Sequence, residues 1–274
     1  AADAAEAIRR TVAFLQSPSD AAEPGAGIPA YAFIPYPVVF VILARWFHVY
    51  PEPDATTRRE LAHWLWRGVA TGVHQRAAVS AMRFQVREIR EDDSAGSLAR
   101  LLEAVGEPEA REWQLDPFHA IHAASRVELL ALLSRGPRDP SGPVSWRALI
   151  SSGERVARDI FRVDQFHAEP LRRLARTAAN RVLLDARHSN LRTALRTWSW
   201  EKDREALESH LIDEAGRVEL EQGNAETFLA RRASRIRTLV SSFVQRRAGA
   251  GSPRILPVEA YYADSGPLRG NDEP

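Results

Sequence analysis

The sequence predicts a mainly α-helical protein, with a helical bundle followed by a second helical domain that contains a small ββα hairpin. Apolar residues recur at helical spacing through most of the chain. The segment Arg135–Pro143 holds three prolines and two glycines, so no helix continues through it. Only two short segments, 161–166 and 181–185, are predicted as strands. These observations favour helices throughout, with a single small hairpin in the second half.

We divide the chain at the proline-rich segment. Residues 1–135 are predicted to form a helical domain, 136–143 a linker, and 144–248 a second domain. Residues 249–274 are rich in Gly, Pro and charge and are predicted to be a loose tail.

In the first domain the predicted helices are 2–15, 38–50, 56–73, 97–105 and 120–134. Pro37 lies next to the first turn of the second of these, where a missing N–H costs nothing. Asp54 or Thr56 is expected to cap the third, whose apolar stripe has a spacing of three to four residues. The stripe consists of Leu61, Trp64, Leu65 and Val69.

In the second domain a helix is predicted at 146–160. It is followed by the first strand, a loop with a short helix, the second strand, and helices 191–200, 203–211 and 225–247. The last helix carries an apolar stripe on the face expected to meet the core. The stripe consists of Ile236, Leu239, Val240, Phe243 and Val244. Arginines on its other faces are expected to be solvated, with phosphate contact as the alternative. They are Arg231, Arg232, Arg235 and Arg246.

Composition excludes several classes of protein. The chain has no cysteine, so disulfides and thiolate metal sites are excluded, and a cytoplasmic location is expected. The most apolar run, Val38–Phe47, is shorter than the ~20 residues that a membrane span needs. No signal peptide is apparent. The chain starts at Ala1 and its only methionine is Met82, which favours a fragment or a processed chain.

Charge is unevenly distributed although the net charge is only +1. Residues 151–200 hold ten Arg and five Asp or Glu, and residues 201–230 hold three basic and nine acidic residues. Residues 231–254 hold seven Arg and no acid. The pattern predicts a local anion-binding face. Biased codon usage is the alternative, because Lys202 is the only lysine.

Residues of the types used by a one-metal nuclease follow the linker. An HNH-type site needs oxygen or imidazole ligands for one divalent cation and a histidine that deprotonates water. Asp164 and His167 occupy the first candidate segment, and Asn180 and Asn190 bracket the second, which also holds His188. A surface acid, a loop histidine and turn-forming asparagines are the alternative interpretation.

Two other patterns are weaker. His119 and His122 have helical spacing and could share a metal, but no carboxylate with matching spacing joins them. The sequence contains neither a Gly-rich phosphate loop nor a Gly-x-Ser-x-Gly nucleophile motif.

Several segments in order resemble GmrSD-type restriction proteins. They are Ile34–Pro53, Trp64-Leu65-Trp66-Arg67, Thr177–Asn190, Leu207–Ile212 and Phe228–Ile236. The resemblance implies a bacterial anti-phage protein that acts on DNA, including modified DNA, with an HNH-like C-terminal nuclease. It also implies an N-terminal nucleotide-hydrolysing domain, whose Asp-Gly-Gln-Gln-Arg motif is absent from this chain.

The resemblance implies roles for individual residues. Asp164 and Asn190 would bind Mg²⁺ or Mn²⁺, Asn180 would brace the hairpin, and His167 would act as a displaced base. Gln165 occupies the position where the family has its base histidine, and the asparagines are ten residues apart instead of nine. The arginines expected on DNA phosphates are Arg173, Arg176, Arg181 and Arg187. A non-catalytic DNA-binding or interaction module is the alternative function.

Overall fold

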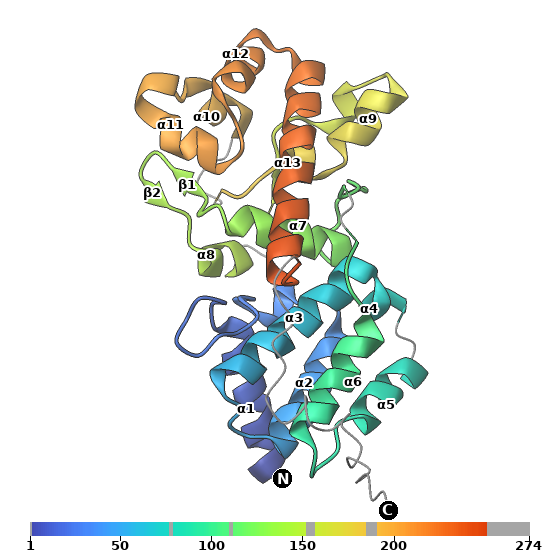
Figure 1. Ribbon diagram of the computed structural model, residues 1–274. Helices are drawn as coiled ribbons and strands as arrows, with labels where there is room; N and C mark the ends of the chain where they lie inside the picture. The colour runs from blue at the N-terminus through green and yellow to red at the C-terminus, as the bar shows by residue number, and fades with distance from the viewer. Residues whose placement is uncertain (1, 77–78, 110–111, 152–156, 185–190, 251–274) are drawn as a thin grey trace, which may run out of the picture. The chain divides into compact units, whose positions relative to one another are not determined.

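Helices dominate the structure, as the sequence predicts, and two small antiparallel sheets of two strands each accompany them (Figure 1). This computed structural model describes residues 2–76, 79–109, 112–151, 157–184 and 191–250. The described residues fall into two units. Of the described residues, the first comprises 2–30, 36–76, 79–109 and 244–250, and the second comprises 31–35, 112–151, 157–184 and 191–243. No helix among the described residues is both long and apolar enough to cross a membrane.

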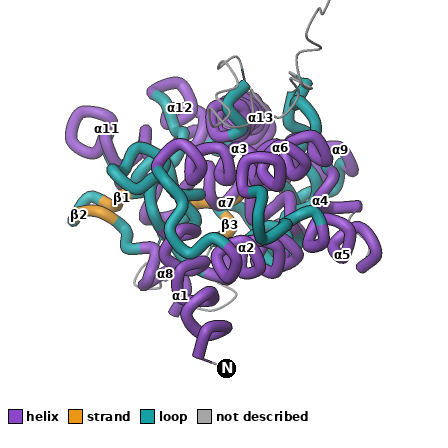
Figure 2. The backbone as a smooth tube through the Cα atoms, turned by 60° about the horizontal axis from the view of Figure 1, so that its bottom comes forward, coloured by secondary structure: helices purple, strands orange, loops and turns teal. Residues whose placement is uncertain are grey.

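The first unit is a helical bundle. Its helices are α1 (Ala2–Gln16), α2 (Pro37–Val49), α3 (Ala55–Thr71), α4 (Val73–Arg76), α5 (Val79–Arg87) and α6 (Ser94–Val105). Helix α1 packs on α2, and α3 packs on α6; Figure 2 shows the second pair side by side. Asp54 caps α3 by accepting a hydrogen bond from the N–H of Thr57 at 2.6 Å, which confirms one of the two predicted caps.

The Trp-Leu-Trp-Arg segment of α3 lies in the core of this bundle. Trp64, Leu65 and Trp66 are each at most 1% exposed. The indole N–H of Trp66 donates to the carbonyl of Ala26 at 3.1 Å. Buried Arg67 donates through Nε to the carbonyl of Ala248 at 2.9 Å. These side chains therefore attach two distant stretches of chain to α3.

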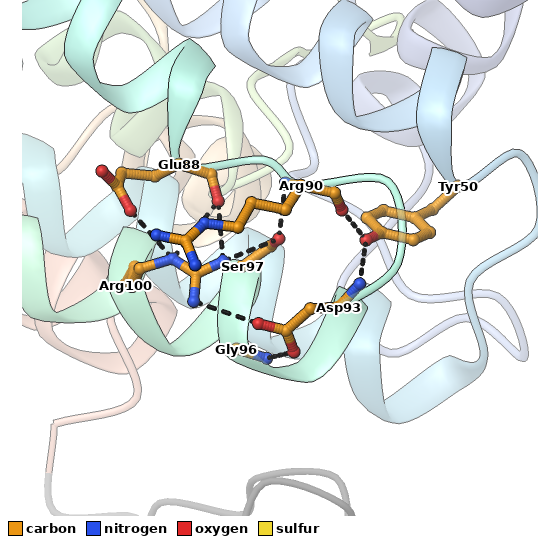
Figure 3. Close-up of polar contacts among 7 residues, drawn as sticks. All are labelled: Tyr50, Glu88, Arg90, Asp93, Gly96, Ser97 and Arg100. Carbon is orange, nitrogen blue, oxygen red and sulfur yellow. Dashed lines mark hydrogen bonds and ion pairs between the residues drawn. The ribbon is translucent and has the colours of Figure 1, made fainter. Parts of the chain in front are cut away.

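A polar network fixes the loop between α5 and α6 (Figure 3). Asp93 caps α6 by accepting from the N–H of Gly96 at 2.8 Å, and its second oxygen lies 3.1 Å from Arg100. Arg100 also pairs with Glu88 at 2.8 Å. The hydroxyl of Tyr50, just after α2, donates to the carbonyl of Arg90 and accepts from the N–H of Asp93. The network thus joins the ends of three helices.

The second unit contains the remaining elements. They are η1 (Tyr31–Phe33), α7 (Ala123–Leu133), β1 (Arg138–Asp139), β2 (Gly142–Pro143), α8 (Trp146–Ser151), β3 (Arg158–Asp159), η3 (Val163–Gln165), α9 (Glu169–Ala175), η4 (Ala178–Asn180), β4 (Arg181–Val182), α10 (Leu191–Thr197), α11 (Trp200–Ser209), α12 (Glu214–Gln222) and α13 (Ala225–Arg247). The last residues of α13, from Val244, belong to the first unit.

Helix α13 has the bounds that the sequence predicts, and it contributes Phe228, Leu229 and Ala233 to the second unit's core. Ile236, Val240 and Phe243 of the predicted stripe are at most 3% exposed. Phe228, near its start, is buried and meets the ring of Phe161 edge-on at 5.6 Å. The apolar face of α13 therefore covers the segment that follows β3.

The segment 136–143, predicted as a linker, lies inside the second unit. Its glycines and prolines do end α7, but Arg138 then pairs with Pro143 and Asp139 with Gly142 in an antiparallel turn. The backbone of Arg138 also bonds the side chains of Ser209 and His210 at 3.0 and 2.8 Å. A stretch that cannot be helical is here a hairpin docked on the end of α11.

The predicted strand 161–166 is wrong. The strand ends at Asp159, and residues Val163–Gln165 form the short 3-10 helix η3. The sequence analysis also missed helices α4, α5 and α12. Backbone bonds from the partner segment reach only Ile160, and the N–H of Phe161 is bonded by the side chain of Asn180 instead.

Candidate functional site

The second sheet, β3–β4, is the centre of the candidate site. Arg158 pairs with Val182 and Asp159 with Arg181 in antiparallel register. Helix α10 is the next described element after β4. The strands are separated by η3, α9 and η4, so this is a long-range pairing rather than a tight turn.

Asn180 extends this pairing beyond the strands. Its backbone carbonyl accepts the N–H of Ile160 at 2.9 Å. Its side-chain Oδ1 accepts the N–H of Phe161 at 2.9 Å, and Nδ2 donates to the carbonyls of Phe161 and Ala175, each at 2.8 Å. Both amide hydrogens are used and the side chain is 0% exposed. Asn180 therefore acts as a brace and does not face a ligand.

The local sequence explains how Asn180 reaches this position. Thr177 caps η4 by accepting from the N–H of Ala179 at 3.2 Å. Ala175, Ala178 and Ala179 are fully buried, because small side chains let the backbone of η4 approach its neighbours. The turn ends at Asn180, whose side chain then satisfies groups of β3 and α9 that the two-residue strands leave unpaired.

Arg232 of α13 fastens the other side of this turn. Its Nε donates to the carbonyl of His210 at 2.9 Å, and Nη1 donates to the carbonyl of Ala178 at 3.1 Å. Further bonds go to the carbonyls of Ala179 and Arg181. The side chain is 1% exposed, and burial lowers its pKa to about 9, so it remains a cation at neutral pH. The expectation that Arg232 is solvated is wrong.

The arginines beside it on α13 do lie nearer to solvent. The side chain of Arg231 is 42% exposed and pairs with Glu219 at 2.9 Å, and that of Arg235 is 32% exposed and pairs with Asp213 at 3.1 Å. On a helical wheel Arg232 lies on the apolar stripe, four residues before Ile236 and eight before Val240, so the periodicity did carry a signal for its burial. Its place in the segment Phe228–Ile236, which carries part of the resemblance, is a second hint.

Asp164 lies in η3, away from the strands, and is exposed. Both of its oxygens face Arg162: Nε lies 3.1 Å from Oδ1 and Nη2 lies 2.5 Å from Oδ2. The hydrogen bond from Arg162 holds the pKa of this carboxyl below its usual value. His167 is exposed between η3 and α9. Neither residue lies on a strand, so the expectation that the first strand carries this acid–histidine pair is wrong.

Three predicted site residues lie outside the described part of the chain. They are Asn190, the second predicted metal ligand, His188 and Arg187. Among the described residues, no group of three or more His, Asp or Glu side chains is close enough to hold a metal ion. Asp164, with both oxygens on an arginine, and Gln165, an amide, do not by themselves fit the ligand set of a hard divalent cation.

The predicted phosphate-binding arginines divide into two kinds. Arg173 and Arg176, on and just after α9, are exposed. The Arg173 side chain is 72% exposed, and its Nε lies 4.0 Å from Oε1 of Glu169, which is a long ion-pair distance. Arg181, by contrast, is 16% exposed, pairs with Asp159, and lies over the ring of Phe118 at 5.3 Å. Burial lowers the pKa of Arg181.

Glu128 is a buried ionisable group that the sequence analysis did not single out. It lies on α7, is 1% exposed, and accepts the indole N–H of Trp113 at 3.1 Å through Oε1. Burial raises its pKa to about 7. A glutamate within a leucine-rich helix is the signal in the sequence that could have found it.

His119 and His122, the pair considered for a shared metal, precede α7. Their rings are 4.8 Å apart and both residues are exposed. The two rings are tilted by 57° to each other, and within the described residues no carboxylate or third histidine completes a metal-binding group with them.

No family model, no curated protein and no solved structure matches this chain. The family membership suggested by the sequence therefore stays a prediction, and the geometry of the second unit is the main guide to function.

Proposed function

We propose that the second unit binds the phosphate backbone of DNA on a degenerate HNH-like ββα frame. The supporting observation is the way Asn180 holds α9. Its Nδ2 joins the carbonyl of Ala175, at the end of α9, to the carbonyl of Phe161, after β3. Exposed Arg173 and Arg176 are thereby fixed relative to the paired strands β3 and β4.

Charge favours an anionic partner for this surface. Residues 162–176 contain four arginines, Arg162, Arg172, Arg173 and Arg176, against the two acids Asp164 and Glu169. Arginines on a fixed element bind phosphate with less loss of side-chain freedom than arginines on a loose loop. The resemblance to restriction proteins points to the same partner. Backbone contacts of this kind position a protein on DNA without reading its sequence.

The test is the salt dependence of DNA binding. Arg173→Gln and Arg176→Gln should each weaken binding of a fluorescent duplex and reduce the slope of log K against log salt by about 0.9. Arg204→Gln is the matched control, because Arg204 is a 64% exposed arginine on α11 that pairs with Glu208. Absence of binding at low salt, or an equal effect of all three changes, would overturn the proposal.

Metal-dependent phosphodiester cleavage is the second candidate. It is favoured by the Asn180 brace, which corresponds to the bracing asparagine of the HNH-like frame that the resemblance implies. Plasmid cleavage with Mg²⁺ or Mn²⁺ should then be lost in Asp164→Ala and His167→Ala. Cleavage that is unaffected by both changes, or DNA binding without cleavage, would contradict this second candidate. Backbone binding would then be the only proposed function that remains.

A further inference from the structure

A pocket of about 290 Å³ lies beside β4 in the second unit. Three stretches of chain line it: the segment before α7, the residue before β3, and the first residue of β4. The lining residues are Phe118, His119, Ala120, Ile121, Ala157 and Arg181. Most of these side chains are apolar, and one fixed cation is present among them.

The cation is held in one orientation. The Arg181 guanidinium pairs with Asp159 and lies over the ring of Phe118, 5.3 Å from its centroid. Because Asp159 offsets the charge, the pocket has little net attraction for a bare anion. A guanidinium fixed in this way instead offers a flat, weakly hydrated surface, on which planar rings stack well.

The rim of the pocket is unusually apolar for a surface turn. Ile121 is 77% exposed, the highest value among the large hydrophobic residues described as exposed. His119, which lines the same pocket, is exposed, and its ring lies 4.8 Å from that of His122. An aliphatic side chain next to two imidazole rings suits a partner with an apolar face and polar edges.

The pocket is joined to the proposed backbone-binding surface. The N–H of Phe118 donates to the carbonyl of Arg176 at 2.8 Å. The wall of the pocket is therefore tied to the end of α9, close to the arginines proposed to hold phosphates. A strand bound there would have its sugars and bases near the opening.

We propose that this pocket receives one unpaired base of a nucleic-acid strand, an inference that rests on the proposed backbone binding. The volume is at the lower limit of the roughly 300–1,000 Å³ range of small-molecule pockets, which suits one base and not two. A base within a duplex has both faces covered by its neighbours, so only an unpaired or extruded base could stack against Arg181.

The test compares a paired duplex with the same duplex carrying one bulged 2-aminopurine. The intact chain should bind the bulged duplex about tenfold more tightly, the size of one stacked base. Binding should also protect the bulged 2-aminopurine from acrylamide quenching. Ile121→Ser should reduce the preference to about threefold or less. Val218→Ser is the matched control, because Val218 is a 45% exposed aliphatic residue of the same unit, and it should keep the preference.

The outcomes separate this inference from the proposed function. Salt-dependent binding of both duplexes with equal affinity would overturn the inference that the pocket receives a base, and would leave backbone binding intact. A bulged base that stays fully accessible to acrylamide would do the same. No binding of either duplex at low salt overturns both. If Ile121→Ser and Val218→Ser reduce the preference for the bulged duplex equally, the inference that the pocket receives a base is also overturned.

Discussion

Asn180 and Phe161 bond each other twice: the N–H of Phe161 donates to Oδ1 of Asn180 at 2.9 Å, and Nδ2 of Asn180 donates to the carbonyl of Phe161 at 2.8 Å. The side chain thus replaces a strand partner where the two-residue sheet ends. The same Nδ2 reaches Ala175. The candidate surface on α9 depends on this single amide.

Asn180→Asp should destabilise the second unit strongly. A carboxylate would point an acceptor at the carbonyls of Phe161 and Ala175, in a site with no exposure to water. We expect a loss of about 3 kcal/mol or more, measured by urea denaturation. Asn224→Asp is the control, because Asn224 is exposed and its amide bonds only Gln222 in the described structure. Equal losses in the two variants would contradict the bracing role.

Arg232→Lys should also destabilise the second unit, although it keeps the positive charge. A lysine cannot reach the carbonyls of His210, Ala178 and Arg181 together, so buried acceptors lose their donors. The expected loss is about 3 kcal/mol. The neighbouring change Arg231→Lys, at an exposed pair with Glu219, should have little effect. The stability of both variants is measured by denaturation in guanidinium chloride. Equal midpoints would show that the buried side chain of Arg232 does not hold this turn in place.

Gly68→Ala should destabilise the first unit, although alanine is the better helix former. A Cβ at this position of α3 would overlap Nε2 of the His74 ring, which is 3% exposed. Overpacking of this kind costs roughly 1–3 kcal/mol. Adding His74→Ala removes the ring, so the double variant should lose less stability than the sum of the two single variants. Strict additivity would show that the ring and the glycine do not meet.

Glu128 should make stability depend on pH. Burial raises its pKa from 4.5 to about 7, so the folded chain binds a proton that the unfolded chain releases between these values. Stability should therefore fall by about 3 kcal/mol as the pH rises from 4.5 to 7 and then level off. Glu128→Gln should abolish this decline, whereas Glu112→Gln, at an exposed position, should not.

The measurement is the difference in unfolding free energy between each variant and the parent across this pH range. A difference is needed because His74 acts in the opposite sense. Burial lowers its pKa from 6.5 to about 4, so the unfolded chain binds the extra proton and stability rises with pH between these values. A flat difference curve for Glu128→Gln would contradict a buried, proton-binding carboxyl.

Helical periodicity was sufficient to predict most of the helices. The bounds of α13 and the cap of α3 at Asp54 follow from local spacing and local hydrogen bonds, which depend on residues close together in the chain. The bracing role of Asn180 followed from the resemblance, and its hydrogen bonds agree with it. The helix bounds and the cap need no knowledge of what lies across the core, whereas the brace links residues 19 positions apart.

The rest of the candidate site depended on contacts between distant residues. The partners of Arg232 lie 22 to 54 positions away, so helical spacing could place it on the core face of α13 but could not reveal which carbonyls it bonds. The same holds for Arg181 with Asp159 and Phe118, and for the hairpin at 138–143. The sequence by itself determined where helices form, because their hydrogen bonds are local. Only the tertiary structure decided which arginines remain free to meet a ligand, because burial is a property of what packs against them.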